Sequence, residues 1–350
     1  MSETKRAYVR PLDLKNGVID MTHGAGGRAT AQLISEVFAK AFDNAYLAEG
    51  HDGATLPAMT GKPVMSCDGH VVEPLEFPGG DIGRLAVCGT VNDVAVCGAK
   101  PKYLSASFIL EEGLPLKTLV NVVTSMKKAA DEAGVAIVTG DTKVVEKGHG
   151  DGIFIATTGV GEKTADFSVA GQNARAGDAV LVSGSMGDHG ITILSHREGL
   201  SFGVDLQSDC APLNGMIEVL LEKFGDKIHV LRDPTRGGLA TTLNEIAAQS
   251  SVGVVLQEED IPVKDSVMSA CEFLGLDPLY IANEGKLIVI CDGAVAQDVL
   301  ATLQAQKYGE DAAIVGHVTE ENPGMVEMKT ALGGTRLVDW LNSDPLPRIC

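Results

Sequence analysis

The chain has 350 residues, and its 28 Lys and Arg against 47 Asp and Glu give a formal net charge of −19. This acidic balance argues against nucleic acid or an anionic membrane surface as the main partner. Hydrophobic residues make up 45% of the chain, yet no apolar run approaches the roughly 18 residues needed to span a bilayer. We therefore expect a soluble globular protein of about two domains.

Seven cysteines are scattered along the chain without any Cys-x-x-Cys pair. An odd count without paired spacing is not typical of a disulfide scaffold or a structural zinc site, and it indicates reduced thiols in a cytoplasmic protein. We expect the first six to be small core residues. They are Cys67, Cys88, Cys97, Cys210, Cys271 and Cys291.

Strand-like and helix-like patterns alternate through the first half of the chain. The residues 116–133 repeat apolar side chains every three or four positions, as an amphipathic helix does, and Gly134 suits its C-cap. The apolar run 135–139 reads as a strand that stops abruptly at 140–143. The other elements expected here are strands at 63–67 and 153–160 and helices at 29–41 and 82–99.

A break in the pattern between 161 and 178 predicts a domain boundary, after which the alternation resumes. The expected elements are strands at 179–182, 252–256, 287–291 and 312–318 and helices at 212–224, 237–249 and 294–306. Helices and strands thus alternate in both halves, which predicts two layered α/β or α+β domains. We place them at 1–165 and 166–335, followed by a tail over 336–350.

The tail ends in Cys350 behind two prolines, which favour an extended, unpacked backbone. A mobile terminal thiol suits a covalent carrier that visits more than one site. The alternative interpretation is an incidental terminal cysteine.

Four aspartates are candidate ligands of a hard cation such as Mg²⁺, because they lie at expected strand ends and loops or within an apolar helix. They are Asp68, Asp93, Asp141 and Asp233. Asp93 is the strongest candidate, since its apolar helix offers it no capping role. Asp233 could instead be a helix N-cap and Asp141 a turn residue.

Three glycine clusters precede expected helices, where backbone amides and the helix dipole favour a phosphate. They lie at 23–28, 184–190 and 236–238, and each could equally be a tight turn. His23 and His189 are by default solvated or hydrogen-bonded histidines. Lys143 could neutralise a phosphate and Glu284 could act as a base, although both could also be ordinary loop charges.

Motifs spread over nearly the whole chain resemble those of the HypE family, the carbamoyl dehydratases of [NiFe]-hydrogenase maturation. They include His-Gly-Ala-Gly-Gly at 23–27, Gly-Thr-Val-Asn-Asp at 89–93, Gly-Asp-Thr-Lys at 140–143, Asp-Pro-Thr-Arg-Gly-Gly at 233–238 and the terminal Pro-Arg-Ile-Cys. The ending is the most specific of them. The Asn-Asp, Gly-Asp-Thr and Asp-Pro-Thr-Arg-Gly-Gly pieces are shared with a superfamily that includes aminoimidazole ribotide synthetase, selenophosphate synthetase and thiamine-monophosphate kinase.

The resemblance implies a two-domain PurM-like α+β fold with a flexible C-terminal tail. It implies ATP and Mg²⁺ as cofactors and a homodimer formed through an ATP-binding domain at 1–165. It further implies that the carbamoyltransferase HypF loads a carboxamide onto the terminal thiol. The chain would then use ATP to dehydrate this group to a thiocyanate, and the cyanide would pass to iron on the HypC–HypD complex.

The resemblance also assigns roles to residues of this sequence. Catalysis would depend on Cys350, Lys143 and Glu284, and the four aspartates would hold the metal. ATP would be bound by His23, Gly24, Gly26, Gly27, Asn92, Thr142, Gly187, Asp188, Arg236, Gly237 and Gly238.

The sequence departs from the family pattern at Gly69-His70 and over 49–62, which affects the expected nucleotide contacts. Two alternatives stay open. Another enzyme of the superfamily, such as a selenophosphate synthetase, would need a reactive Cys near the first glycine loop, and none precedes Cys67. A non-catalytic carrier that only presents Cys350 would need neither the carboxylates nor the glycine loops.

Overall fold

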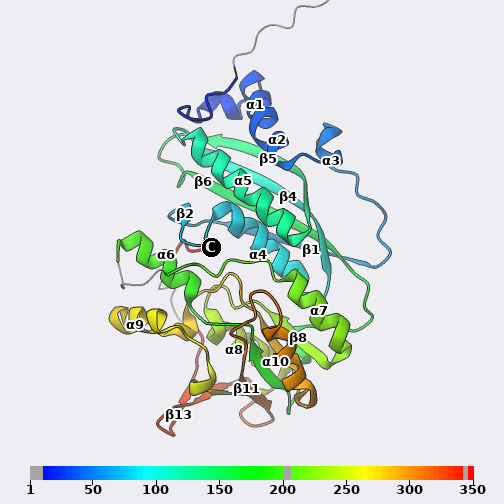
Figure 1. Cartoon of the computed structure of the whole chain (residues 1–350), viewed down its shortest axis with the longest axis vertical. Coiled ribbons are helices and arrows are strands. Elements are labelled where there is room, and N and C mark those ends of the chain that lie inside the picture. Colours follow the sequence, from blue (N-terminus) through cyan, green and yellow to red (C-terminus); the bar gives the residue numbers. More distant parts are fainter. Residues whose placement is uncertain (1–10, 201–205, 342–345) are drawn as a thin grey trace, which may run out of the picture.

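The computed structural model describes residues 11–200, 206–341 and 346–350 (Figure 1). Its upper part in Figure 1 is built on a four-stranded sheet with the order β1-β6-β4-β5. The strands are β1 (Lys62–His70), β4 (Lys100–Glu111), β5 (Ala136–Val145) and β6 (Ile153–Lys163). β4 and β5 run parallel and the other neighbours antiparallel. Helices α4 (Ile82–Val96) and α5 (Leu116–Ala133) cover one face of this sheet.

Short elements complete this first domain. The N-terminal helical turns η1 (Met21–Gly24), α1 (Arg28–Leu33), η2 (Ile34–Phe38), α2 (Ala39–Phe42) and α3 (Ala45–Ala48) lie beside β5 and α5. A hairpin of β2 (Glu76–Phe77) and β3 (Gly80–Asp81) leads directly into α4. Asp81 caps that helix, because its carboxylate accepts the amide of Arg84 at 2.8 Å.

The second domain contains a seven-stranded sheet with the order β13-β12-β9-β11-β7-β10-β8. Its strands are β7 (Ala179–Val182), β8 (Ile228–Arg232), β9 (Gly253–Gln257), β10 (Ile288–Cys291), β11 (Ala313–Thr319), β12 (Val326–Lys329) and β13 (Thr335–Leu337). Its helices are α6 (Asp188–Glu198), α7 (Asn214–Phe224), α8 (Gly238–Ser250), α9 (Asp265–Leu274) and α10 (Ala296–Gln304). Five short turns join them: η3 (Gly171–Asn173), η4 (Gly225–Lys227), η5 (Glu258–Asp260), η6 (Pro278–Tyr280) and η7 (Gly293–Val295).

Three strands are longer than the sequence predicts. β1 continues through Asp68 to His70, β5 through 140–143 to Val145, and β6 to Lys163. The glycine at 140 is not a turn residue: a Cβ there would lie 2.2 Å from the carbonyl oxygen of Ala106 on β4. Gly140 therefore permits close approach of two strands, and the expected strand end at this point is wrong.

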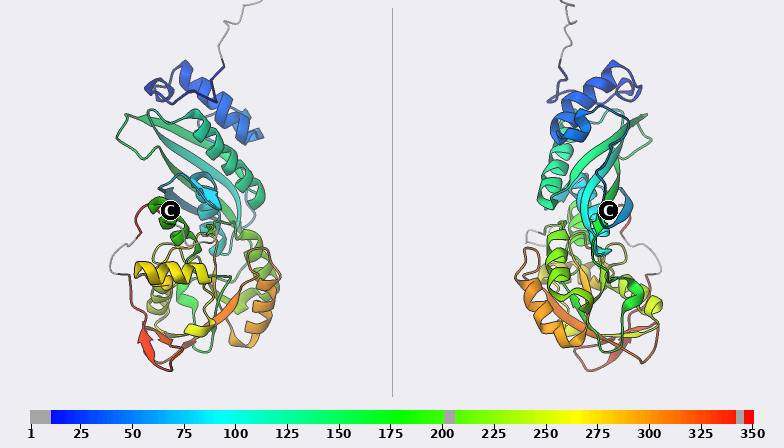
Figure 2. Two further views of the ribbon diagram at one scale, coloured as in Figure 1. Left: turned by 60° about the vertical axis from the view of Figure 1, so that its left-hand side comes forward. Right: turned by 90° about the vertical axis from the view of Figure 1, so that its right-hand side faces the viewer.

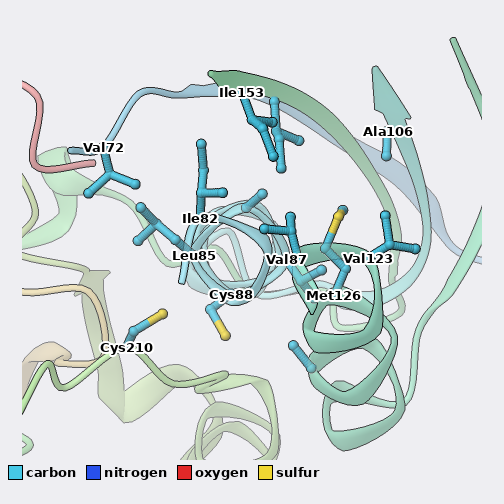
Figure 3. Close-up of a cluster of buried hydrophobic side chains, with 14 of the residues drawn as sticks. Val72, Ile82, Leu85, Val87, Cys88, Ala106, Val123, Met126, Ile153 and Cys210 are labelled. Carbon is cyan, nitrogen blue, oxygen red and sulfur yellow. The ribbon is translucent and has the colours of Figure 1, made fainter. Parts of the chain in front are cut away.

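Helix α4 is the centre of the first core (Figure 3). Val87 on α4 packs near Val123 and Met126 of α5, and Cys88 lies on the side of α4 that faces the second domain. There its thiol contacts that of Cys210, which precedes α7. The core therefore runs across the domain boundary.

The expectation that six cysteines lie in the core is confirmed for four of them. Cys67 and Cys97 are exposed, so the expectation is wrong there. Cys67 lies on the uncovered face of the edge strand β1, and Cys97 follows the last turn of α4. Within the described ranges, no helix is long and apolar enough to cross a membrane.

The last five residues are packed against the first domain. Val72 and Ile349 form an antiparallel bridge, and Leu346 and Ile349 are each only 3% exposed. The C-terminus lies where the two domains meet in every view (Figures 1 and 2). The expected unpacked tail is thus wrong for 346–350, because its two apolar side chains are buried. The stretch 342–345 lies outside the described residues.

Candidate active site

A cavity of about 140 Å³ lies where the two domains meet, beside the C-terminus. It is lined by six residues that the sequence singled out from distant parts of the chain: Asp68, Asp93, Asp233, Arg236, Glu284 and Cys350. A larger cavity of about 420 Å³, along α7 and the start of β4, contains none of the predicted residues. The smaller cavity is therefore the candidate active site on chemical grounds.

The first domain contributes Asp68 and Asp93 from facing elements. Side chains alternate along β1, so Ser66, Asp68 and His70 all point toward α4. Ser66 donates its hydroxyl to Asp93 on α4 at 2.7 Å. Gly89, one turn earlier on α4, leaves room for the His70 and Asp68 side chains. A Cβ at this position would lie 3.1 Å from the His70 ring and 3.4 Å from the Asp68 carboxylate.

The second domain contributes Asp233 and Arg236 from the loop that joins β8 to α8. Gly237 precedes the helix with φ +79°, and Gly238 begins it with φ +59°. A Cβ on Gly238 would lie 2.5 Å from the Leu279 carbonyl oxygen, so this turn fits only glycine. Asp233 does not cap α8, and its alternative interpretation as an N-cap is wrong.

Glu284 reaches the cavity from the loop between η6 and β10. This loop is fixed by Asn283, whose side chain donates to the Pro234 carbonyl and accepts the Gly187 amide. The amide of Glu284 itself donates to Asp209 at 2.9 Å. The Glu284 side chain is buried, and its Oε1 lacks a hydrogen-bond partner in the described structure. A buried, unsatisfied carboxyl oxygen facing a cavity is typical of a group that meets a ligand.

Burial, reinforced by repulsion between neighbouring carboxylates, raises the pKa values of the acidic groups in the cavity. Burial, followed by the nearby charge of Asp93, raises the pKa of Asp233 to about 7. Burial also raises the pKa of Asp93. Burial and then Asp209 raise the pKa of Glu284 well above its usual value. A bound cation would relieve this repulsion.

The carboxylates fit a Mg²⁺ ion that is coordinated jointly by the protein and a nucleotide, rather than one coordinated by protein side chains alone. Among the described residues, no three His, Cys, Asp or Glu side chains are arranged to hold a metal ion by themselves. Magnesium is commonly held by one or two carboxylates together with substrate phosphates and water. Asp68 and Asp93 supply such oxygens, and the other ligands would arrive with a nucleotide.

A second group of predicted residues lies elsewhere. Asp141 and Lys143 form an exposed ion pair of 2.6 Å on β5, and that pairing lowers the pKa of Asp141. The adjacent Thr142 is buried on the helix-covered side of the strand. The glycine loop after His23 packs here, because Gly24 lies against Val144.

Within one chain, the predicted grouping of Asp141 and Lys143 with Cys350 is not found. Asp68 and Gly140 share a register row across β1-β6-β4-β5, so β1 and β5 are three strand spacings, or about 14 Å, apart. Asp141 and Lys143 lie one and three residues beyond Gly140 on β5 and therefore point to the uncovered face, opposite to Asp68. The alternative interpretation of Asp141 as a turn residue is also wrong, because it lies inside β5.

The remaining predicted ligands have mostly structural partners. Asn92 is buried on α4 and binds the main chain of Ala211 and Leu213, which ties the two domains together. Asp188 is buried at the start of α6 and accepts Ser185 and Lys264. Gly187 precedes that helix with φ +87°. By contrast, Gly26 and Gly27 border open space, as a phosphate-binding loop would require.

Sequence reasoning missed two buried residues behind the cavity. Asp209 orients Glu284 through its amide, and burial raises the pKa of Asp209. His189 is fully buried rather than solvated, and it bonds to Ser208 and to the carbonyl of Ile349. The sequence predicted His189 as a solvated or hydrogen-bonded residue, and the second alternative is confirmed, but no local pattern reveals its contact with the end of the chain.

A family model described as AIR synthase related protein, N-terminal domain, matches residues 50–162, and the corresponding C-terminal domain model matches 175–329. Carbamoyl dehydratase HypE of Cupriavidus necator is 57% identical over 347 residues, which is 99% of each chain. The chain belongs to the HypE family of carbamoyl dehydratases. This membership confirms the predicted enzyme class and role in hydrogenase maturation, and it excludes a selenophosphate synthetase.

Solved HypE structures support the same conclusion. The chain is similar to HypE in complex with ATP, with a TM-score of 0.91 and 55% identity, over 94% of this chain and 99% of that one. It is also similar to a chain in the crystal structure of a HypE–HypF complex, with a TM-score of 0.78 and 51% identity, over 88% and 99% of the two chains. The two-domain PurM-like α+β fold is confirmed.

Proposed function

We propose that this chain uses ATP to dehydrate a carboxamide carried on its own Cys350 thiol, leaving a thiocyanate. The observation that carries the proposal is the position of Cys350. The last residue of the chain lines the same cavity as carboxyl groups from both domains. A terminal cysteine with no role has no reason to be held there.

The proposed reaction removes oxygen as phosphate, because an amide oxygen is a very poor leaving group. The carboxamide oxygen attacks the γ-phosphorus of ATP, and ADP leaves. The nitrogen loses one proton as the C=N bond forms. Breakage of the C–O bond then releases inorganic phosphate, and loss of the second nitrogen proton leaves the S–C≡N group.

The charged residues of the cavity suit a phosphoryl transfer. Arg236 lies in the cavity wall and can neutralise phosphate oxygens. Asp68 and Asp93 would hold Mg²⁺ together with phosphate oxygens, and the bound ion would offset negative charge on the phosphates. Gly27 borders open space in the loop beside β5, away from this cavity, so its backbone amide would reach further phosphate oxygens only from a second copy. The Gly26 amide already donates to the Thr30 hydroxyl at 3.0 Å.

Glu284 is the proposed base for the nitrogen protons. Its raised pKa makes it a strong proton acceptor once it is ionised. A cation near Asp68 and Asp233 would weaken their repulsion of Glu284 and favour its carboxylate form. Its Oε1 has no hydrogen-bond partner among the described residues, and Glu284 lines the cavity in which the substrate would bind.

A homodimer would bring Lys143 to the reaction. The uncovered sheet face that carries Asp141 and Lys143 also exposes Met65 (73%) and Ile109 (41%), and apolar groups on such a face favour burial against a second copy. We propose that the second copy supplies its β5 edge to this site. ATP would then bind where the two domains and the two copies meet.

We propose one partner for the step before dehydration and another for the step after it. HypF would load Cys350, as the structure of a relative in a HypE–HypF complex suggests. The HypC–HypD complex would accept the cyanide. We place these steps in the cytoplasm, where the exposed thiols of Cys67 and Cys97 stay reduced.

The test is ATP turnover by the purified protein with HypF and carbamoyl phosphate. We expect ATP-dependent loss of one water from the carbamoylated C-terminal peptide, detected by mass spectrometry. Cys350→Ala should abolish loading. A loaded cysteine that remains unchanged while ATP is available would instead show a carrier without dehydratase activity.

A further inference from the structure

The backbone of the docked end of the chain makes its own set of hydrogen bonds, beside the buried side chains of Leu346 and Ile349. The amide of Val71 donates to the terminal carboxylate of Cys350 at 3.0 Å, and the amide of Glu73 donates to the carbonyl oxygen of Arg348 at 3.2 Å. Residues 348–350 therefore lie antiparallel beside residues 71–73, which follow β1, and pair with them as two strands do. Such contacts recognise an extended main chain rather than particular side chains.

Arg197, on the last turn of α6, makes three hydrogen bonds at this point. Its Nε donates to the Glu73 carbonyl at 2.9 Å, and its two terminal nitrogens donate to the carbonyls of Pro347 and Arg348 at 2.8 and 2.7 Å. One guanidinium thus joins both strands of the pairing to the second domain. A planar fork of donors suits this geometry, whereas an ammonium group does not.

His189 holds the next carbonyl along the tail. Its Nε2 lies within hydrogen-bond distance of the Ile349 oxygen, and since a carbonyl only accepts, Nε2 carries the hydrogen. Nδ1 then accepts the Ser208 hydroxyl at 2.8 Å. The ring is buried and stands edge-on to Phe77, so its orientation is fixed on both sides.

From this geometry we propose that Arg197 and His189 form a latch that holds the main chain of the tail and keeps the Cys350 thiol in the active-site cavity. The proposal deepens the proposed function, on which its catalytic consequence rests. Neither residue touches the reacting group, so both are positioning residues. The latch determines how often the Cys350 thiol lies in the cavity. Dehydration needs the thiol in the cavity, whereas loading by a partner needs it outside the cavity.

The latch binds main-chain groups of the tail, whereas another set of polar contacts involves the Arg348 side chain. The Arg348 side chain pairs with Glu73 and Asp151, and these three groups are substantially exposed and screened by salt. Arg197 instead binds carbonyl groups that every tail sequence possesses. Mutation of the Arg348 side chain should therefore weaken docking less than removal of Arg197.

The test compares full-length Arg197→Gln with wild type by the rate at which iodoacetamide alkylates Cys350, measured by peptide mass spectrometry. Cys97, which is exposed after the last turn of α4, provides the reference rate within each molecule. We expect the ratio of Cys350 to Cys97 alkylation to rise about tenfold, which corresponds to about 1.4 kcal/mol of latch free energy. Arg197→Lys should give an intermediate ratio, because it keeps the charge but loses the fork.

Arg175→Gln is the matched control, because this arginine is exposed and precedes β7, where its amide donates to Asp178; its ratio should equal that of wild type. An unchanged ratio in Arg197→Gln would overturn the proposal. The alkylation assay needs no catalytic turnover, so it tests the latch even if the dehydratase reaction itself is disproved. With pre-loaded protein, Arg197→Gln should also lower the single-turnover dehydration rate while HypF-dependent loading is maintained or faster.

Discussion

Glu284 combines burial, an unpartnered oxygen and a raised pKa at the wall of the cavity. We expect Glu284→Gln to be loaded normally at Cys350 but to dehydrate the loaded group at least about 100-fold more slowly, the usual effect of losing a general base. Single turnover of pre-loaded protein with ATP measures this. Glu259→Gln, an exposed change on η5, should have no effect, and dehydration by Glu284→Gln at the wild-type rate would rule Glu284 out as the base.

Asp233 makes stability depend on pH. Its carboxyl keeps a proton in the folded chain up to a pKa of about 7, whereas the unfolded group has the ordinary value of 3.8. The folded state therefore binds more protons between these values, and its stability falls as pH rises through this window. One pKa unit corresponds to about 1.4 kcal/mol, and pocket water screens part of this.

We therefore expect Asp233→Asn to be more stable than wild type by about 2 kcal/mol at pH 8 and equally stable below pH 4. Urea unfolding in chelator, without nucleotide, measures the difference. If the two proteins lose stability in parallel from pH 4 to 8, the carboxyl is not the source of the dependence.

The turn before α8 is the element that positions Asp233 and Arg236, and it depends on Gly238. Gly238→Ala combines a positive φ of +59° with a Cβ 2.5 Å from a backbone carbonyl, so we expect a loss of about 3 kcal/mol or more. Gly134→Ala is the matched control, since Gly134 has φ +69° at the end of α5 but open space around it. It should cost only about 1 kcal/mol.

Thermal or urea unfolding of the two variants separates backbone strain from steric clash. Equal losses in both would show that the carbonyl groups near Gly238 move aside at little cost.

Elements with a regular repeat of apolar residues were predictable from the sequence. Elements that depend on contact with a segment distant in the sequence were not. The amphipathic pattern at 116–133 gave α5 correctly, with Gly134 as its left-handed cap. The strand β5 was predicted too short, because a glycine that admits the β4 backbone reads locally as a turn. The docked tail was missed for the same reason: two prolines indicate an extended chain but not a partner for it.

At the scale of the whole molecule, the sequence motifs identified the candidate site residues. They did not show that these residues form two separate groups in the folded chain. Asp68, Asp93, Asp233 and Glu284 converge with Cys350 as expected. Asp141 and Lys143 lie on the opposite face of the sheet and at its other edge. A motif records residue types and order, whereas strand order and the face of each side chain depend on pairing over long separations in the chain.

This division leads to a test of the proposed homodimer. If Lys143 of one copy serves Cys350 of the other, co-expressed Lys143→Ala and Cys350→Ala chains form mixed dimers with one complete site. Random pairing makes half of the dimers mixed, so about a quarter of wild-type dehydration should return. Each variant alone should be inactive. No recovery in mixed dimers confirmed by mass spectrometry would show that Lys143 does not act on the other copy.

The most direct test of the account follows the oxygen atom that leaves the carboxamide. Cys350 would be loaded with a carbamoyl group that carries heavy oxygen, and mass spectrometry would confirm the label on the isolated protein before ATP is added. The account predicts that the label appears in inorganic phosphate, one labelled phosphate for each thiocyanate formed. Thiocyanate formation with the label released into water, and none in phosphate, would contradict it.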